Sequence, residues 1–459
     1  MQTQCNSTLT RKFRVAGRDV VADFDGGEIT SDAGALLLGR TDAVIGLVDR
    51  LAGCFKDARD ADLIEHSVRT LVLQRVVGIA LGYEDLNDHD ELRYDPVLAV
   101  LAGKLEARRK DCQPLAGKST LNRLERSVAG QTTRYQKISH DGLAIEGLLV
   151  ELFIDAHAAP PSAITLDLDA TDDPLHGDQE GRFFHGYYDG YCYLPLYIFC
   201  GKHLLVAKLR RANIDGSAGA REELERVVHQ IRARWPQVRI TVRADSGFAR
   251  DELMGWCEAN AIDYVFGLAR NTGLTSHIGE AQERARVRCE ATGEAAREFC
   301  DFEYSTRKSW SRARRVVGKA EQLPGKPNPR FVVTSLTAEH LDARALYEDV
   351  YCARGEMENR IKECQADLFA DRTSAATMHS NQLRLWFSSF AYVLVDSLRR
   401  IALTGTALAQ STCGSIRLKL LKIGARVTRS VRRIKIAMAS SHPYQSLWSL
   451  AYERLIHDG

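Results

Sequence analysis

The sequence predicts an α/β protein with a mixed central sheet that is first antiparallel and then parallel. Three observations lead to this fold class. Apolar and polar residues alternate with a period of two over 163–169, which is typical of a strand. Further β-like segments follow directly. Helical and strand patterns then alternate over 218–268, which is the spacing of parallel strands joined by crossover helices.

Composition is that of a globular protein with one unusual end. The 459 residues suffice for two to four structural units, and 45% are hydrophobic and 27% charged. The net charge of +2 is unevenly spread, because 401–451 lacks Asp and Glu while Arg and Lys crowd 417–435. Such a basic end favours a polyanionic partner.

Cysteine usage and hydropathy exclude several classes of protein. The 11 cysteines include no Cys-x-x-Cys pair, so the ligand spacing of a zinc site is absent. An odd cysteine count without an apolar leader at the N-terminus indicates reduced thiols in a cytoplasm. No apolar run approaches the roughly 20 residues that span a membrane. We therefore expect a cytoplasmic protein without membrane segments.

Residues 1–158 are expected to be mostly helical. A hairpin turning at Gly17 is expected over 12–24, and helices over 31–51, 61–81, 96–105, 119–128 and 142–157. The segment Ser119–Arg126 suits either a DNA-reading helix or a solvated amphipathic helix, and on the segment alone the second is favoured. The Pro-containing segment 158–162 marks a boundary.

The central sheet is expected to follow that boundary. Strands are expected over 163–169, 182–200, 203–209, 238–244 and 264–268, with helices over 218–234 and 250–260. The first three strands form an antiparallel meander. Asp169 ends the first strand and Asp245 follows the fourth. In open α/β sheets this carboxyl edge is where ligands bind.

Residues 270–340 break the alternation. A polar helix over 275–290 precedes β-like pieces at 298–304, 314–319 and 330–334. Basic residues, among them Arg314 and Arg315, surround Trp310. A basic stretch with an aromatic residue suits a phosphate-contacting surface with a base-stacking side chain, and a solvated hairpin explains it equally well.

The chain is expected to turn helical again from residue 343. This part contains Tyr351, Arg354 and Glu358, and a long apolar helix follows over 377–403. The tail over 416–438 alternates apolar and basic residues around Gly424-Ala425, which is closer to a hairpin than to a helix.

Three acidic positions, Asp169, Asp245 and Glu358, are candidates for one site. Carboxylates without Cys or His partners suit Mg²⁺ or Mn²⁺, and two such ions about 4 Å apart activate a water or a 3′-hydroxyl at a phosphodiester. The strand order is that of a ribonuclease H-like fold, in which the first and fourth strands are neighbours. Alternatively, acids at strand ends are common turn or capping residues.

The other acids of the first strand receive separate interpretations. Asp167 lies on the same face as Asp169, about 7 Å deeper, and is expected to pair with a basic residue or to shape the site. Asp172 and Asp173 come after the strand and are expected as turn residues.

The sequence resembles the DDE transposases of bacterial insertion sequences. Tyr351-x2-Arg354-x3-Glu358 resembles most of their Tyr-x2-Arg-x3-Glu-x6-Lys signature, and Asp169-Ala-Thr and Asp245-Ser-Gly-Phe-Ala-Arg resemble their two Asp motifs. Residues 168–177 and 181–188 resemble the IS-thirteen-eighty family. The likeness covers nearly the whole chain. It departs at Gln365, where the signature has Lys, and Lys362 is expected to cover the same phosphate.

The resemblance implies roles for these residues. Asp169, Asp245 and Glu358 would be catalytic, binding two Mg²⁺ ions (Mn²⁺ substituting) for DNA nicking and strand transfer, while Tyr351 and Arg354 hold the DNA backbone. Trp310 would stack on a flipped base. Further expected DNA contacts are Arg314, Arg315, Arg360, Lys362, Arg426, Arg429, Arg432 and Arg433.

The implied partners are double-stranded DNA, as terminal inverted repeats and target, and a second copy of the chain in the synaptic complex at a bacterial nucleoid. The expected organisation is a helical DNA-binding region (1–158), a catalytic core in two parts (159–270 and 341–403), a β-rich insertion (271–340) and a basic DNA-binding tail (404–459).

Two alternatives stand beside this interpretation. The chain could be a transposase-derived DNA-binding protein without catalysis, which the three intact acids disfavour. A glycoside hydrolase with paired carboxylates would explain acids in a cleft but not the basic tail.

Overall fold

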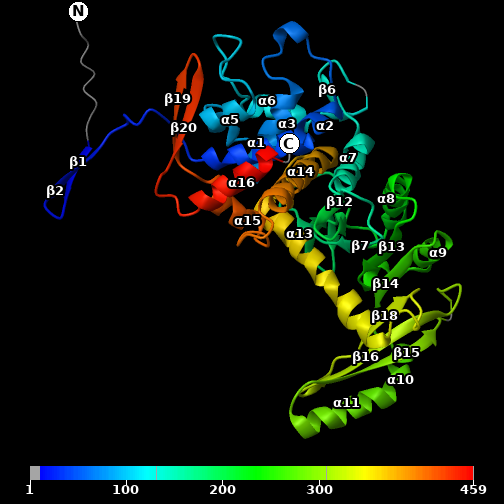
Figure 1. The fold of residues 1–459 in the computed structure, drawn as a ribbon. Helices are drawn as coiled ribbons and strands as arrows, with labels where there is room; N and C mark the ends of the chain where they lie inside the picture. The colour runs from blue at the N-terminus through cyan, green and yellow to red at the C-terminus, as the bar shows by residue number, and fades with distance from the viewer. Residues whose placement is uncertain (1–10, 131, 307, 458–459) are drawn as a thin grey trace, which may run out of the picture.

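A computed structural model describes residues 11–130, 132–306 and 308–457. The N-terminal and C-terminal helices gather at one end of the molecule, and the sheet extends away from them toward the helix 279–292 at the other end (Figure 1). The helical segment 343–368 runs between the two ends. It contacts β14 (Asp263–Leu268) and β16 (Arg314–Leu323) at its start and α14 (Met378–Ala402) and α15 (Cys413–Ile416) at its finish. Among the described residues, no helix is long and apolar enough to cross a membrane.

The N-terminal region is mostly helical, as the apolar periodicity predicts. Its helices are α1 (Leu36–Ile45), α2 (Leu47–Gly53), α3 (Val68–Ala80), α4 (His89–Leu92), α5 (Pro96–Leu101), α6 (Lys118–Glu125) and α7 (Gly142–Asp155). Its strands are β1 (Arg11–Val15), β2 (Arg18–Ala22), β3 (Glu28–Thr30), β4 (Phe55–Asp57), β5 (Val128–Ala129) and β6 (Ile138–His140).

Two of the predicted helices are shorter than expected. Gly46 has a left-handed φ of 64°, which glycine adopts without a steric penalty, and it divides the helix predicted over 31–51 into α1 and α2. The helix predicted from residue 61 begins only at Val68, where the Ser67 side chain accepts a hydrogen bond from the Thr70 amide.

A nine-stranded sheet forms the centre of the molecule. Its main path runs in the order β12-β11-β7-β13-β14-β18-β16-β15, and β17 pairs with β16. The strands are β7 (Ala163–Ala170), β11 (Leu196–Cys200), β12 (His203–Lys208), β13 (Arg239–Ala244), β14 (Asp263–Leu268), β15 (Ala296–Tyr304), β16 (Arg314–Leu323), β17 (Lys326–Pro327) and β18 (Arg330–Thr334). β7, β11 and β12 are antiparallel, whereas β13 is parallel to β7 and β14. The predicted mixed sheet is confirmed.

One strand is predicted over the aromatic segment 182–200, but the segment forms three strands. Only β11 joins the large sheet. β9 (Phe183–His185) and β10 (Gly190–Tyr193) pair with β8 (Asp173–Pro174) in a separate small sheet. Residues 270–340 extend the large sheet, because β18 pairs antiparallel with β14. They also contribute α10 (Thr272–His277) and α11 (Gly279–Thr292).

Two large apolar cores hold these layers together. One lies between the sheet and α8 (Ala220–Arg234) and α9 (Asp251–Ala259). The other contains α3, β11 and α14 (Met378–Ala402), a 25-residue buried helix that joins the N-terminal helices to the sheet.

The C-terminal part packs back onto the N-terminal region. It contains α15 (Cys413–Ile416), β19 (Ala425–Ser430), β20 (Arg433–Met438) and α16 (Gln445–His457). The predicted hairpin forms as β19 and β20, but it turns at residues 431–432 rather than at Gly424-Ala425. The reason is that residues 417–421 continue α15 as a helical turn and Ala425 pairs with β3.

Candidate active site

Two of the candidate acids lie at the same edge of the sheet. β7 and β13 are parallel neighbours, with Leu168 opposite Ala244, so Asp169 and Asp245 follow paired residues. Asp245 begins a 3₁₀ turn, and its Oδ1 accepts a hydrogen bond from the Gly247 amide at 2.8 Å. The strand register therefore places both carboxylates side by side.

An irregular helical segment brings the third acid to them. It consists of a π-helical turn (Leu346–Tyr351), a 3₁₀ turn (Cys352–Arg354) and α13 (Gly355–Leu368). The Arg354 guanidinium donates to Asp169 Oδ2 at 3.2 Å and to Glu358 Oε1 at 2.5 Å, and so bridges two carboxylates. π-helical turns are frequent at functional sites.

Tyr351, from the same helical segment, lies beside β14 near the candidate acids. Gly267 of β14 is needed there, because a Cβ on it would lie 2.5 Å from the Tyr351 hydroxyl oxygen and 3.1 Å from the Ser246 amide. The tyrosine hydroxyl therefore lies against the backbone that follows Asp245. Burial raises the pKa of Tyr351, and the nearby Arg354 charge opposes this shift.

The electrostatics of the site are dominated by crowded carboxylates. The pKa of Asp169 is raised to about 6. Burial is the largest cause, the charges of Asp245 and Glu358 act in the same direction, and the charge of Arg354 opposes them. The Asp169 side chain is 16% exposed and that of Glu358 43%, so the site opens toward α13.

The donor set suits a hard cation, but the geometry is not that of a formed metal centre. Three carboxylates are the ligands that Mg²⁺ prefers. Within the described residues, however, no three Asp, Glu, His or Cys side chains lie close enough to hold an ion. Arg354 supplies the compensating positive charge instead.

Two further acids near the site, Asp167 and Asp173, are buried and contact other residues of the protein. Asp167 pairs with Arg243 of β13, as expected of a residue that shapes the site. Asp173 is not a turn residue as predicted, because it lies in β8 with no exposed surface. Gln365 donates to Asp173 Oδ1 at 3.3 Å and to the Asp172 carbonyl at 3.1 Å. Gln365 therefore faces the protein interior.

The two basic residues of α13 have different surroundings. Arg360 pairs with Glu363 at 2.6 Å, so its charge is compensated within the protein, and the expected phosphate contact is not supported. Lys362 is exposed and has no acidic partner in the described part of the chain. It stays available for DNA.

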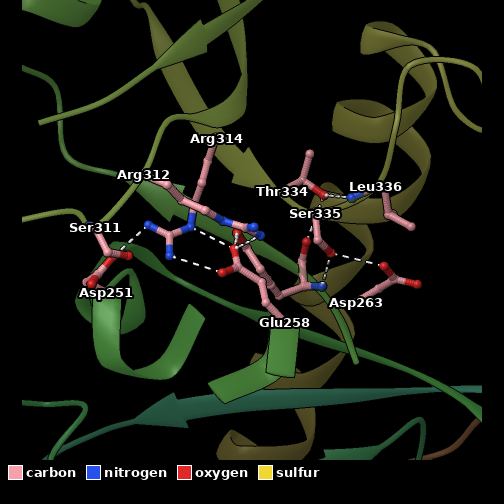
Figure 2. Close-up of polar contacts among 10 residues, drawn as sticks. Asp251, Glu258, Asp263, Ser311, Arg312, Arg314, Thr334, Ser335 and Leu336 are labelled. Atoms are coloured by element: carbon pink, nitrogen blue, oxygen red, sulfur yellow. Dashed lines mark hydrogen bonds and ion pairs between the residues drawn. The ribbon is translucent and has the colours of Figure 1, made fainter. Parts of the chain in front are cut away.

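Two basic residues near Trp310, Arg314 and Arg315, are paired inside the protein, which does not support their predicted DNA contacts. The Arg314 side chain is 2% exposed and pairs with Asp251 and Glu258 of α9 at 2.7 and 2.8 Å (Figure 2). Arg315 is 12% exposed and pairs with Asp301 at 2.5 Å. Their charges tie β16 to α9 and to β15, so neither is free for a phosphate.

Trp310 also packs on the protein. Its ring lies 5.5 Å from the Arg314 guanidinium and meets Tyr304 edge-on at 5.8 Å. It is half-buried rather than projecting. A base-stacking role would require the ring to leave these contacts.

The tail arginines are more accessible. Arg429 pairs with Glu28 at 2.7 Å, whereas Arg426, Arg432 and Arg433 are exposed without an acidic partner in the described residues. Three of the four predicted tail contacts are therefore unpaired cations on one hairpin.

Sequence reasoning missed a basic cleft of about 620 Å³ in the N-terminal region. It is lined by Arg59, Asn122, Arg123, Arg126, Thr133, Tyr135, Gln136, Lys137 and Ile138, with no acidic residue. Arg123, Arg126 and Lys137 are exposed and lack acidic partners among the described residues, and Tyr135 is 87% exposed. The Ser119–Arg126 segment was the available signal, but nothing local showed that residues 133–137 face it.

One comparison, with models of known protein families, identifies the family of this chain. Residues 13–458 match the family model described as "Transposase DDE domain group 1". No curated protein matches the chain. Among solved structures, a cryo-EM structure of a piggyBac transposase synaptic complex with hairpin DNA is similar, with a TM-score of 0.44 and 12% sequence identity, covering 93% of this chain and 82% of that chain.

Proposed function

The chain belongs to the transposase family with a group 1 DDE domain, and we propose that it cuts and rejoins DNA at the terminal inverted repeats of its own insertion sequence. We assign it to the Tyr-Arg-Glu signature group, most like the IS-thirteen-eighty family, with a ribonuclease H-like core. The observation that carries the proposal is the gathering of Asp169, Asp245 and Glu358 around Arg354 at one sheet edge.

In this proposal Asp169, Asp245 and Glu358 hold two Mg²⁺ ions. The bound ions would activate a water or 3′-hydroxyl and stabilise the leaving oxygen of a phosphodiester. Arg354 contacts two of the same carboxylates, so a cation held there would compete with it and would leave its guanidinium free to contact a DNA phosphate. Tyr351, whose hydroxyl lies beside Gly267 near the backbone that follows Asp245, would hold the DNA backbone near the cut.

We propose two further surfaces that bind DNA. The basic cleft in the N-terminal region has exposed cations without acidic neighbours, and the β19–β20 hairpin presents Arg426, Arg432 and Arg433. Phosphate contacts of this kind supply affinity that does not depend on sequence. Two element ends must be held together for strand transfer, so we propose that a second copy of the chain joins the complex on DNA.

The test uses purified protein and labelled DNA carrying the inverted repeats that flank its own coding sequence. Expected products are nicks at the element ends in the presence of Mg²⁺ and none with EDTA. Binding without nicking in Mg²⁺ or Mn²⁺ would favour the second candidate, a DNA-binding protein derived from a transposase. A protein that neither binds nor nicks this DNA would refute the proposal.

A further inference from the structure

A buried ion pair joins the two central strands directly beneath the candidate acids. Asp167 of β7 and Arg243 of β13 are register partners. Arg243 Nε donates to Asp167 Oδ1 at 2.5 Å and Nη2 donates to Oδ2 at 2.8 Å. The two residues are 3% and 8% exposed. Both carboxylate oxygens of Asp167 are therefore engaged by one guanidinium.

The same guanidinium reaches a third segment. Arg243 Nη1 donates to the carbonyl oxygen of Val350, the residue before Tyr351 in the π-helical turn. Each of the three joined segments leads into the site. Asp169 follows Asp167 by two residues, Asp245 follows Arg243 by two, and the bridging Arg354 follows Val350 by four.

Stability alone does not explain why charged residues occupy this place. A well-packed apolar pair of similar volume is often as stable as a buried ion pair. A guanidinium, in contrast, presents its N–H groups in one rigid plane, so it fixes both the distance and the angle of whatever it binds. Here it binds one carboxylate and one backbone carbonyl on separate elements.

We infer that Asp167 and Arg243 are positioning residues that set the placement of Asp169, Asp245 and the segment 351–358 relative to one another. The inference rests on the proposed function and deepens it. Asp167 is thereby distinguished from Asp169, because its oxygens are committed to Arg243 and are not offered to a cation. A shift of about 1 Å between reacting groups costs roughly 100-fold in rate.

The test replaces the pair by apolar residues in the double variant Asp167→Leu/Arg243→Met. We expect a melting temperature close to that of the parent, at least about a tenfold loss of Mn²⁺ affinity by titration calorimetry without DNA, and about a 100-fold slower cleavage of labelled end DNA. The matched control is Arg75→Met/Glu125→Leu, another buried pair with 4% and 1% exposed side chains. It should bind Mn²⁺ like the parent.

The outcomes separate this inference from the proposed function. A folded double variant with parental Mn²⁺ affinity and cleavage overturns the inference. If the double variant does not fold, Arg243→Lys keeps the charge pair but lacks the rigid planar fork that binds Asp167 and the Val350 carbonyl together. Folded Arg243→Lys with parental Mn²⁺ affinity also overturns it, and weakened affinity supports it. A parent that binds Mn²⁺ but never cuts DNA refutes the proposed function alone, and a parent that binds no Mn²⁺ refutes both.

Discussion

At the scale of single residues, Arg354 has two competing roles. It compensates the charges of Asp169 and Glu358 in the protein alone, and in the proposed mechanism it contacts DNA when a cation replaces it. Arg354→Ala should therefore lower the Mg²⁺ concentration needed for half-maximal cleavage while reducing the maximal rate by roughly 10- to 100-fold, because a charged hydrogen bond contributes about 1.5–3 kcal/mol. A Mg²⁺ titration of cleavage at pH 8, above the pKa of Asp169, checks both effects. A higher half-maximal Mg²⁺ concentration would contradict the competition.

Asp173 gives a pH-dependent prediction. Burial raises the pKa of its carboxyl well above the usual range of an aspartic acid, although Gln365 opposes this. The folded state therefore binds a proton that the unfolded state releases, so this stability is present below about pH 4 and is lost as pH rises through the folded pKa.

Asp173→Asn stays neutral at every pH. We expect it to match the parent near pH 4 and to be more stable at pH 8 by about 1.4 kcal/mol for each unit by which the folded pKa of Asp173 exceeds its unfolded pKa. Denaturant unfolding at both pH values measures this. Asp178→Asn, at a 93% exposed side chain, is the control and should change stability by less than about 0.5 kcal/mol. Equal stability of Asp173→Asn and parent at pH 8 would show that burial does not raise the pKa of Asp173 in the fold.

The sequence predicts some of these residues and not others for a physical reason. Asp169 lies near the end of β7 and Asp245 directly after β13, and the alternation of both strands is local, so their common edge can be inferred from sequence. The sequence does not show that Arg314 and Asp173 lie inside the protein, because their partners lie far along the chain. Asp251, Glu258 and Gln365 decide whether these charges are internal, and no local pattern reports that.

At the scale of elements, α13 depends on an internal anchor. Glu363 of this helix is 4% exposed and binds Arg399 of α14, Arg360, and the Cys413 amide at 2.6 Å. These contacts hold the helix that carries Glu358. Removing one partner of a buried pair leaves the other charge without compensation.

Glu363→Gln should therefore destabilise the protein by roughly 3 kcal/mol, the low end for a broken buried pair because Arg399 keeps Asp396 at 3.1 Å. The midpoint of urea unfolding reports the change. The control Arg286→Met breaks pairs whose side chains are 43–64% exposed, and it should cost less than about 1 kcal/mol. Equal shifts in the two variants would mean that Glu363 does not anchor α13.

Element order is predicted better than element ends. The mixed sheet and the adjacency of β7 and β13 follow from alternation and crossover spacing. The break at Gly46, the departure of β9 and β10 into a small sheet, and the hairpin turn at 431–432 depend on tertiary pairing, such as that of Ala425 with Thr30 of β3.

At the scale of the whole molecule, unpaired cations mark two proposed DNA-binding surfaces away from the acidic site. Arg123→Gln/Arg126→Gln should weaken binding to any duplex and flatten the dependence of log K on log salt by about 0.9 for each phosphate that the variant no longer neutralises. Fluorescence anisotropy at several salt concentrations measures the slope.

The control for this measurement is Arg239→Gln/Lys326→Gln, which removes two exposed cations outside both surfaces. It should leave the slope unchanged. If the two double variants shift the slope equally, the cleft is not a distinct DNA-binding surface and general charge accounts for the effect.

Metal-dependent DNA cleavage by the three acids is the central claim, and Asp245→Asn tests it most directly. Cleavage of labelled element ends in Mg²⁺ is compared among the parent, Asp245→Asn and the control Asp263→Asn. Asp263 begins the neighbouring strand β14, and its carboxyl accepts a hydrogen bond from the Ser335 hydroxyl (Figure 2). We predict a loss of more than roughly 100-fold for Asp245→Asn, because a metal ligand contributes several kcal/mol to the transition state, and parental cleavage for Asp263→Asn. Parental cleavage by a folded Asp245→Asn variant would contradict the central claim.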